Sequence, residues 1–94
     1  MSESVMQVRE VEITHRLGLH ARACARIVTL ASRFRSNVAL YCGRRRASAR
    51  NIISVMLLAG RAGSRIRVET DGPDESDAMA AMVGLLTTGL GAAA

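Results

Sequence analysis

The apolar residues of this chain switch repeatedly between a spacing of two and a spacing of three and four, and this rhythm limits the folds open to it. A spacing of two puts apolar side chains on one face of a strand, whereas a spacing of three and four puts them on one face of a helix. The pattern predicts strands over 7–14, 37–42, 46–49 and 65–70, and helices over 21–34, 52–58 and 73–86. The predicted order is therefore β-α-β-β-α-β-α.

The predicted strands are half polar, and this decides the fold class. Ile66 and Val68 alternate with charged residues. In the first strand Val8 breaks the alternation, so we expect the paired part to begin near Arg9. Strands with one polar face are typical of an antiparallel sheet that has helices on one face and water on the other. We expect an α+β fold with a four-stranded antiparallel sheet and three helices on one face.

The end of the chain carries signals for the start and the stop of its last helix. Pro73 is expected in the first helical turn, with acidic residues following near the positive end of the helix dipole. We expect residues 87–94 to form a fraying tail, with Gly89 as the stop.

At 94 residues the chain is expected to form one domain, because two hydrophobic cores would not fit. The longest mostly apolar stretch, 52–59, is far too short to span a bilayer. The first ten residues lack a basic start followed by an apolar run, so no export signal is visible and a cytoplasmic location is expected.

The two cysteines, Cys24 and Cys42, lack the spacing of a metal site. In a reducing compartment we interpret them as small buried hydrophobic residues. We expect no metal and no cofactor, although a Cys/His site that uses His15 and His20 is an alternative.

Charge is unevenly distributed along the chain. All 13 basic residues are arginines at or before Arg67, whereas five acidic side chains lie from Glu69 onward. A net charge of +5 suggests an acidic partner, either a nucleic acid or an acidic protein surface. An RNA-binding sheet normally stacks bases on aromatic side chains. The chain has only Phe34 and Tyr41, which disfavours an RNA-binding module.

The segment from residue 18 to residue 22, Gly-Leu-His-Ala-Arg, falls where a predicted strand gives way to a helix. Backbone N–H groups and the helix dipole make such a helix start an anion site. A histidine there can accept a phosphoryl group on a ring nitrogen. The amides of Ala21 and Arg22 would hold the phosphate oxygens, and the Arg22 guanidinium would add charge-assisted hydrogen bonds. We therefore predict a phosphohistidine site at His20; the alternative is an ordinary solvated histidine.

Two residues near this segment, Arg26 and His15, also have an interpretation that involves no function. Arg26 lies one turn beyond Arg22, where it would either extend a basic rim for an acidic partner or belong to a solvated face. His15 lies at the end of the first strand, where we expect it to be exposed and without a chemical role.

The short middle helix has more apolar residues than one buried face can use. Asn51 is a suitable N-cap for it. We expect Ile52, Ile53 and Met56 to be partly exposed, and an exposed apolar patch often marks a protein interface. A fully buried helix is the alternative.

Three motifs together resemble one family. They are Leu-Gly-Leu-His-Ala-Arg at 17–22, Ser-Ala-Arg-Asn-Ile-Ile at 48–53 and Val-Glu-Thr-Asp-Gly-Pro-Asp-Glu at 68–75. In this order and spacing, the chain from about Val8 to Leu86 resembles the HPr family. These are the small histidine-phosphorylated carriers of bacterial sugar and nitrogen phosphotransferase systems.

The resemblance implies a function and its residues. His20 would be phosphorylated at Nδ1 and Arg22 would steady the phosphate. Enzyme I, charged by phosphoenolpyruvate, would be the donor and an EIIA-type protein the acceptor. Ile52, Ile53 and Met56 would lie in the docking patch that both partners use. The resemblance also implies an open-faced β-sandwich, a monomer, and a stoichiometric carrier rather than an enzyme.

Two positions depart from the family pattern. Ala23 replaces the proline that often follows the active-site arginine. Asn51 occupies the position of a regulatory serine found in many Gram-positive members, so we expect no serine switch. The sequence leaves open whether a sugar or a nitrogen branch is served, and whether phosphorylated His20 acts as a relay or as a regulatory signal.

Overall fold

The computed structural model describes residues 5–90 and contains the predicted order of elements. The strands are β1 (Gln7–Glu12), β2 (Asn37–Cys42), β3 (Arg45–Ser48) and β4 (Arg65–Asp71). The helices are α1 (Ala21–Ala31), α2 (Ile52–Leu57) and α3 (Glu75–Gly84), and a π-helical turn, Leu85–Gly89, continues α3.

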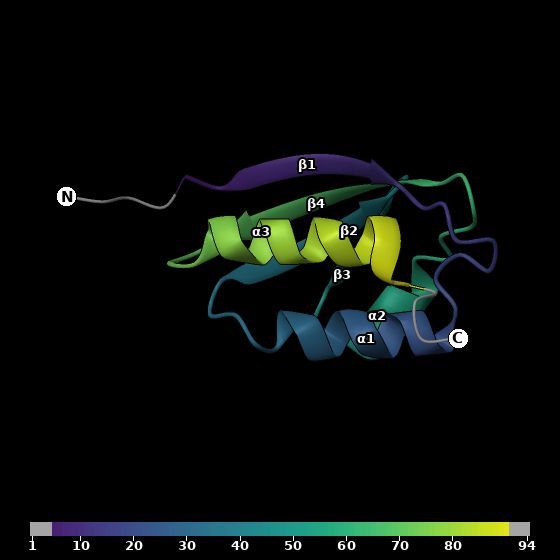
Figure 1. Ribbon diagram of the computed structural model, residues 1–94, viewed down its shortest axis with the longest axis horizontal. Coiled ribbons are helices and arrows are strands. Elements are labelled where there is room, and N and C mark those ends of the chain that lie inside the picture. Colours follow the sequence, from purple (N-terminus) through teal and green to yellow (C-terminus); the bar gives the residue numbers. More distant parts are fainter. Residues whose placement is uncertain (1–4, 91–94) are drawn as a thin grey trace.

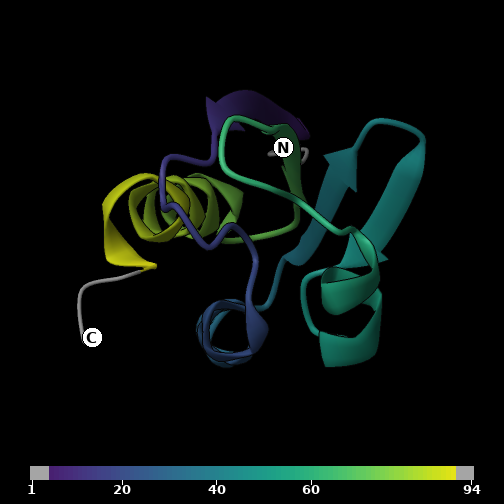
Figure 2. The same ribbon diagram turned by 90° about the vertical axis from the view of Figure 1, so that its right-hand side faces the viewer.

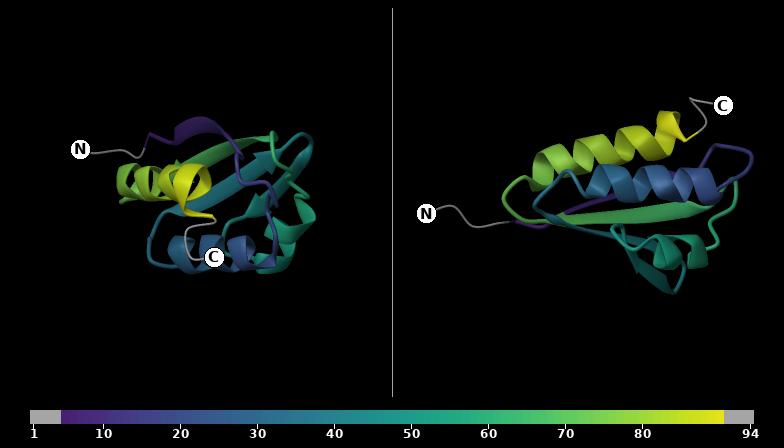
Figure 3. Two further views of the ribbon diagram at one scale, coloured as in Figure 1. Left: turned by 45° about the vertical axis from the view of Figure 1, so that its right-hand side comes forward. Right: turned by 90° about the horizontal axis from the view of Figure 1, so that it is seen from below.

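The four strands form one antiparallel sheet in the order β1-β4-β2-β3. Figure 1 shows α3 and α1 lying along the sheet, and Figure 2 shows all three helices on one side of the curved sheet. Among residues 5–90 no helix covers the other face of the sheet (Figure 2), and Figure 3 gives two further views of this arrangement. The fold expected from the half-polar strands is therefore confirmed.

The core lies between the sheet and the helices because alternate strand residues point inward. Val11 pairs with Ile66 in neighbouring strands, and Leu40 pairs with Val68; all four side chains are buried. From the helices, the core is closed mainly by Ala23, Cys24, Ile27, Ala31, Ala78, Met79, Met82 and Leu86. These residues follow the helical spacing read from the sequence.

The first strand pairs earlier than the alternation suggested. Gln7 is already opposite Thr70 in β4, so the expected start near Arg9 was wrong. Val8, opposite Glu69, lies on the open face with 48% of its surface exposed, which is why it breaks the pattern without ending the strand.

The β2–β3 hairpin is tighter than expected. Its tip is Gly43-Arg44, and Arg45 already pairs with Cys42. Gly43 has a φ of +60°, which a two-residue turn with glycine first requires.

The start of α3 was placed too early. Pro73 precedes the helix, which begins at Glu75 with Asp74 at its N-cap. The Asp74 side chain makes no hydrogen bond to its own helix but turns toward the loop after α1. Its carboxylate accepts from the backbone N–H of Arg35 and Ser36 at 2.9 Å each and from the Ser36 hydroxyl at 2.6 Å. This contact ties the end of α1 to the start of α3.

The predicted tail is wrong for residues 87–90, while residues 91–94 lie outside the described residues. Leu86 and Leu90 are buried, so this segment packs against the core rather than fraying, although the helical turn does end at Gly89 as expected. The Thr87 carbonyl accepts from the Thr14 hydroxyl at 3.4 Å, and the Gly89 carbonyl accepts from Arg26 Nη1 at 2.9 Å. These long-range contacts hold the last turn, and local helix signals do not encode them.

Acid should weaken the fold through Asp74. Hydrogen bonds from the Ser36 hydroxyl, and then from the backbone amides of Arg35 and Ser36, lower its pKa from 3.8 to about 2. The unfolded chain therefore binds this proton more readily than the folded protein. The resulting stabilisation is present above the ordinary pKa and is lost as the pH falls toward the folded value. As the pH falls through this interval, the free energy of unfolding measured with urea should decrease less for Asp74→Asn than for the unmodified protein.

Asp77→Asn, a change in the first turn of the same helix, is the matched control and should follow the unmodified protein. If the free energy of unfolding had the same pH dependence in Asp74→Asn and in the unmodified protein, Asp74 would not be the group responsible for the loss of stability in acid.

Candidate functional site

The loop before α1 is seated tightly on the loop before β4. Gly18 has a φ of +62°, and a Cβ there would lie 2.3 Å from the Gly60 carbonyl oxygen. The next amide, of Leu19, donates to that same oxygen at 2.9 Å, and the Leu19 side chain is buried. Only glycine allows both this backbone conformation and this close approach. We call this close packing of Gly18 against Gly60 the seating of Gly18, and it fixes where α1 begins.

His20 occupies the N-cap position of α1, as the sequence predicted. Its backbone is extended, with φ −75° and ψ 171°, and its Nδ1 accepts weakly from the Ala23 amide at 3.4 Å. Its carbonyl accepts from the Cys24 amide at 2.9 Å. An acceptor at Nδ1 places the proton of the neutral ring on Nε2. The unprotonated nitrogen thus faces the positive end of the helix.

His15 is not where it was expected. It is half-buried rather than exposed, and its ring lies 5.1 Å from the His20 ring between centroids, tilted by 42°. Its Nδ1 accepts from the Leu17 amide at 3.1 Å. No pattern in the sequence indicates this contact, because the turn that brings the two rings together depends on the seating of Gly18.

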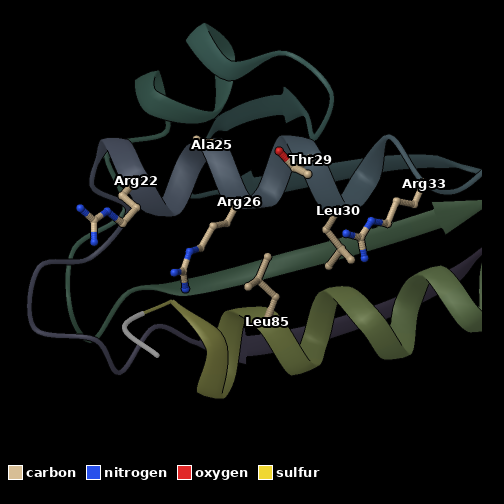
Figure 4. A pocket seen from close by; sticks show the side chains of 7 residues that line it. All are labelled: Arg22, Ala25, Arg26, Thr29, Leu30, Arg33 and Leu85. Carbon is tan, nitrogen blue, oxygen red and sulfur yellow. The ribbon is translucent and has the colours of Figure 1, made fainter. Parts of the chain in front are cut away.

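Arg22 and Arg26 of α1, together with Arg33 just beyond its end, line a groove between α1 and the end of α3. The groove has a volume of about 350 Å³, and Leu30 and Leu85 contribute apolar side chains to it. Figure 4 shows Arg22 at the N-terminal end of the helix, Arg26 directed toward the end of α3, and Arg33 further along. The Arg26 guanidinium bonds the Gly89 carbonyl, so this residue also holds the last turn in place. Arg22 stays at the rim, in the same turn as Ala21 and two residues after His20.

The middle helix exposes most of its apolar side chains. Ile52 is 38%, Ile53 62% and Met56 44% exposed, which confirms the expected exposure. Leu57, 65% exposed, was not singled out although it continues the same helix. We call Ile52, Ile53, Met56 and Leu57 the apolar patch. It adjoins α1, against which α2 packs (Figure 2), and Leu17 of the His20 loop is exposed as well.

Asn51 caps α2, as predicted from its residue type. Its Oδ1 accepts from the Ser54 amide at 3.1 Å. Neither neighbouring serine takes this place: the Ser48 hydroxyl accepts from the Arg50 amide, and Ser54 lies inside the helix.

The cysteines differ from each other in burial. Cys24 is fully buried, its thiol donates to the Leu19 carbonyl, and burial raises its pKa; Cys42 is only half-buried. Among residues 5–90 no three or more His, Cys, Asp or Glu side chains are grouped to hold a metal ion. Over the same residues, every helix falls short of the length and apolar character that a membrane crossing requires.

Comparison with known proteins gives one consistent family. The family described as the PTS HPr component phosphorylation site matches residues 7–88. A phosphocarrier protein HPr from Cupriavidus necator is 43% identical over 86 residues, covering 92% of this chain and 97% of that protein. A phosphocarrier protein NPr from Escherichia coli K12 is 36% identical over 80 residues, covering 84% of this chain and 89% of that protein.

The solved structures agree with the sequence matches. An HPr from Thermoanaerobacter tengcongensis superposes with a TM-score of 0.85 at 30% identity, covering 90% of this chain and 96% of that one. An HPr from Bacillus anthracis gives the same TM-score at 29% identity, covering 88% of this chain and 99% of that one.

The seating of the His20 loop can be tested by comparing two glycines. Gly18 and Gly43 both have φ near +60°, but a Cβ at Gly43 would meet nothing within 4 Å. Gly43→Ala should therefore cost only the left-handed backbone, about 1 kcal/mol. Gly18→Ala should cost about 1–3 kcal/mol more, because the Gly60 carbonyl must move. Chemical denaturation measures both, and equal losses would refute the tight seating.

Proposed function

This chain belongs to the HPr family of phosphocarrier proteins, and on that premise we propose that His20 is the residue that carries the phosphoryl group. The protein relays phosphate from Enzyme I to an EIIA-type protein of a phosphotransferase system. It is a stoichiometric relay and not a catalyst. The observation that carries the proposal is the position of His20 at the N-cap of α1, with Nδ1 facing the first helical turn.

The transfer proceeds through Nδ1. The Nδ1 lone pair of neutral His20 attacks the phosphorus of the donor's phosphohistidine. A P–N bond forms to Nδ1 as the donor's P–N bond breaks, and the electron pair returns to the donor's ring nitrogen. The Nε2 proton stays in place, so the phosphorylated ring is cationic beside the anionic phosphoryl group. The weak 3.4 Å bond from the Ala23 amide is given up in this step, which frees that N–H for a phosphate oxygen.

The helix start and Arg22 supply the electrostatic stabilisation. The amides of Ala21 and Arg22 belong to the first turn, where the helix dipole favours an anion. The guanidinium of Arg22 adds positive charge at the rim of the groove. Both contributions are modest at an open site, which suits a carrier because the phosphoryl group must leave again for the acceptor. Ala23 keeps its amide, which the proline common in this family would lack.

The apolar patch on α2 and the arginines on the α3 side of α1 together form the docking surface of this proposal. Ile52, Ile53 and Met56, extended by Leu57, supply apolar contact next to the helix that begins at His20. Arg26 contributes positive charge for an acidic partner while it also holds Gly89. Enzyme I and the EIIA-type acceptor would use this same surface in turn, because both must reach His20.

The remaining proposals concern the state of the protein. We propose that it acts as a single-domain monomer in the cytoplasm, without a metal or cofactor, and that Asn51 removes any serine switch. A role in nucleic-acid binding is not proposed. Tyr41, the half-buried aromatic residue of the open sheet face, is covered by the Arg67 guanidinium 4.1 Å from its ring centroid, so it offers no bare stacking platform.

Phosphorylation by Enzyme I tests the assignment of His20. Incubation with Enzyme I and labelled phosphoenolpyruvate should give an acid-labile, base-stable label on the unmodified protein and none on His20→Ala. Circular dichroism should show that the variant is folded. A label that persists on folded His20→Ala would move the site elsewhere, and an unlabelled native protein beside active Enzyme I would remove the carrier role.

Truncation of the apolar patch should weaken docking without changing the chemistry. Ile53→Ala or Leu57→Ala should raise the KM for phosphorylation by Enzyme I about fivefold, with kcat little changed. Val8→Ala is the control, because Val8 is an exposed apolar residue on the opposite face of the sheet. An effect of Val8→Ala equal to those of the α2 variants would contradict this docking surface.

A further inference from the structure

One atom of the site is left without a role. His20 Nε2 is buried and has no hydrogen-bond partner among residues 5–90. A buried N–H without a partner costs free energy, and native proteins rarely leave one so. Among residues 5–90, the ring of His20 takes part in a single hydrogen bond, the weak 3.4 Å contact at Nδ1. Hydrogen bonding alone therefore holds the ring poorly, although phosphoryl transfer needs Nδ1 in one orientation.

The neighbouring ring, by contrast, is held firmly. His15 Nδ1 accepts from the Leu17 amide at 3.1 Å, and the His15 carbonyl accepts from the Gly18 amide at 2.8 Å. These two bonds fix His15 in the turn that the seating of Gly18 defines. Its ring stands 5.1 Å from the His20 ring between centroids, within the range of a packed aromatic pair.

We propose that His15 is a positioning residue for His20: the anchored His15 ring packs against the His20 ring and keeps Nδ1 facing the start of α1. Ring packing thus restrains the orientation of the His20 ring in place of a hydrogen bond to Nε2. If His15 is removed, the His20 ring can turn about its Cβ–Cγ bond, and Nδ1 leaves the helix start for part of the time. This inference rests on the proposed function of His20.

Two substitutions separate the ring of His15 from its backbone hydrogen bond. His15→Asn keeps a side-chain acceptor for the Leu17 amide, as in an Asx turn, but removes the ring. His15→Phe keeps a ring but removes the acceptor. If ring packing positions His20, Asn should lower kcat for phosphorylation by Enzyme I about two- to tenfold with KM unchanged, and Phe should restore most of it.

The ring itself gives a second readout. The ¹⁵N chemical shifts of His20 report which nitrogen carries the proton. We expect the Nε2–H tautomer in the native protein and in His15→Phe, and a mixture of tautomers in His15→Asn. A change of fold alone would not restore this signature in one variant and remove it in the other.

The outcomes are distinct. Native kcat and native His20 shifts in His15→Asn would overturn the inference. A loss in His15→Phe with native behaviour in His15→Asn would also overturn it, because the turn and not the ring would then matter. Either result leaves the carrier role intact as long as the native protein is labelled on His20, whereas an unlabelled native protein would remove the carrier role first.

Discussion

The contact between the loop before α1 and the loop before β4 is the constraint on which the site depends. A carbonyl oxygen of Gly60 lies where a side chain at Gly18 would begin, and it accepts from the amide of Leu19. With that contact made, the chain must turn into α1 at His20. The N-cap position of His20 and the approach of His15 both depend on this contact, because the Gly18 amide also bonds the His15 carbonyl.

The energetics of the site suit a group that is received and then passed on. A helix start offers N–H groups and a partial positive charge, and each is worth only about 1 kcal/mol at an exposed position. No carboxylate lies in the first turn of α1 to oppose an incoming phosphate. In the proposed site, Arg22 would add charge at the rim without enclosing the phosphate. Weak and replaceable contacts keep the free energies of the loaded and empty states close, which a reversible relay requires.

Two departures from sequence expectation, at the start of α3 and in the last turn, have one cause. Pro73 lies outside α3 because Asp74 is drawn toward the loop after α1 by the amides of Arg35 and Ser36. The last turn is ordered because Arg26 and Thr14, far away in sequence, bind its carbonyl groups. In each case a long-range hydrogen bond outweighs a local helix signal, and single-sequence patterns contain no information about such partners.

The sequence by itself determined the order of the elements, the inward faces of the strands, and the choice of His20 and Asn51 as caps. These depend on periodicity and residue type, which act over one or two turns of chain. Only the tertiary structure decided that His15 packs against His20, that Leu57 joins the exposed side of α2, and that Arg26 binds the last turn. Those arrangements depend on turns and on contacts between segments that are distant in the sequence. Their geometry therefore forms only once the sheet and the helices have packed.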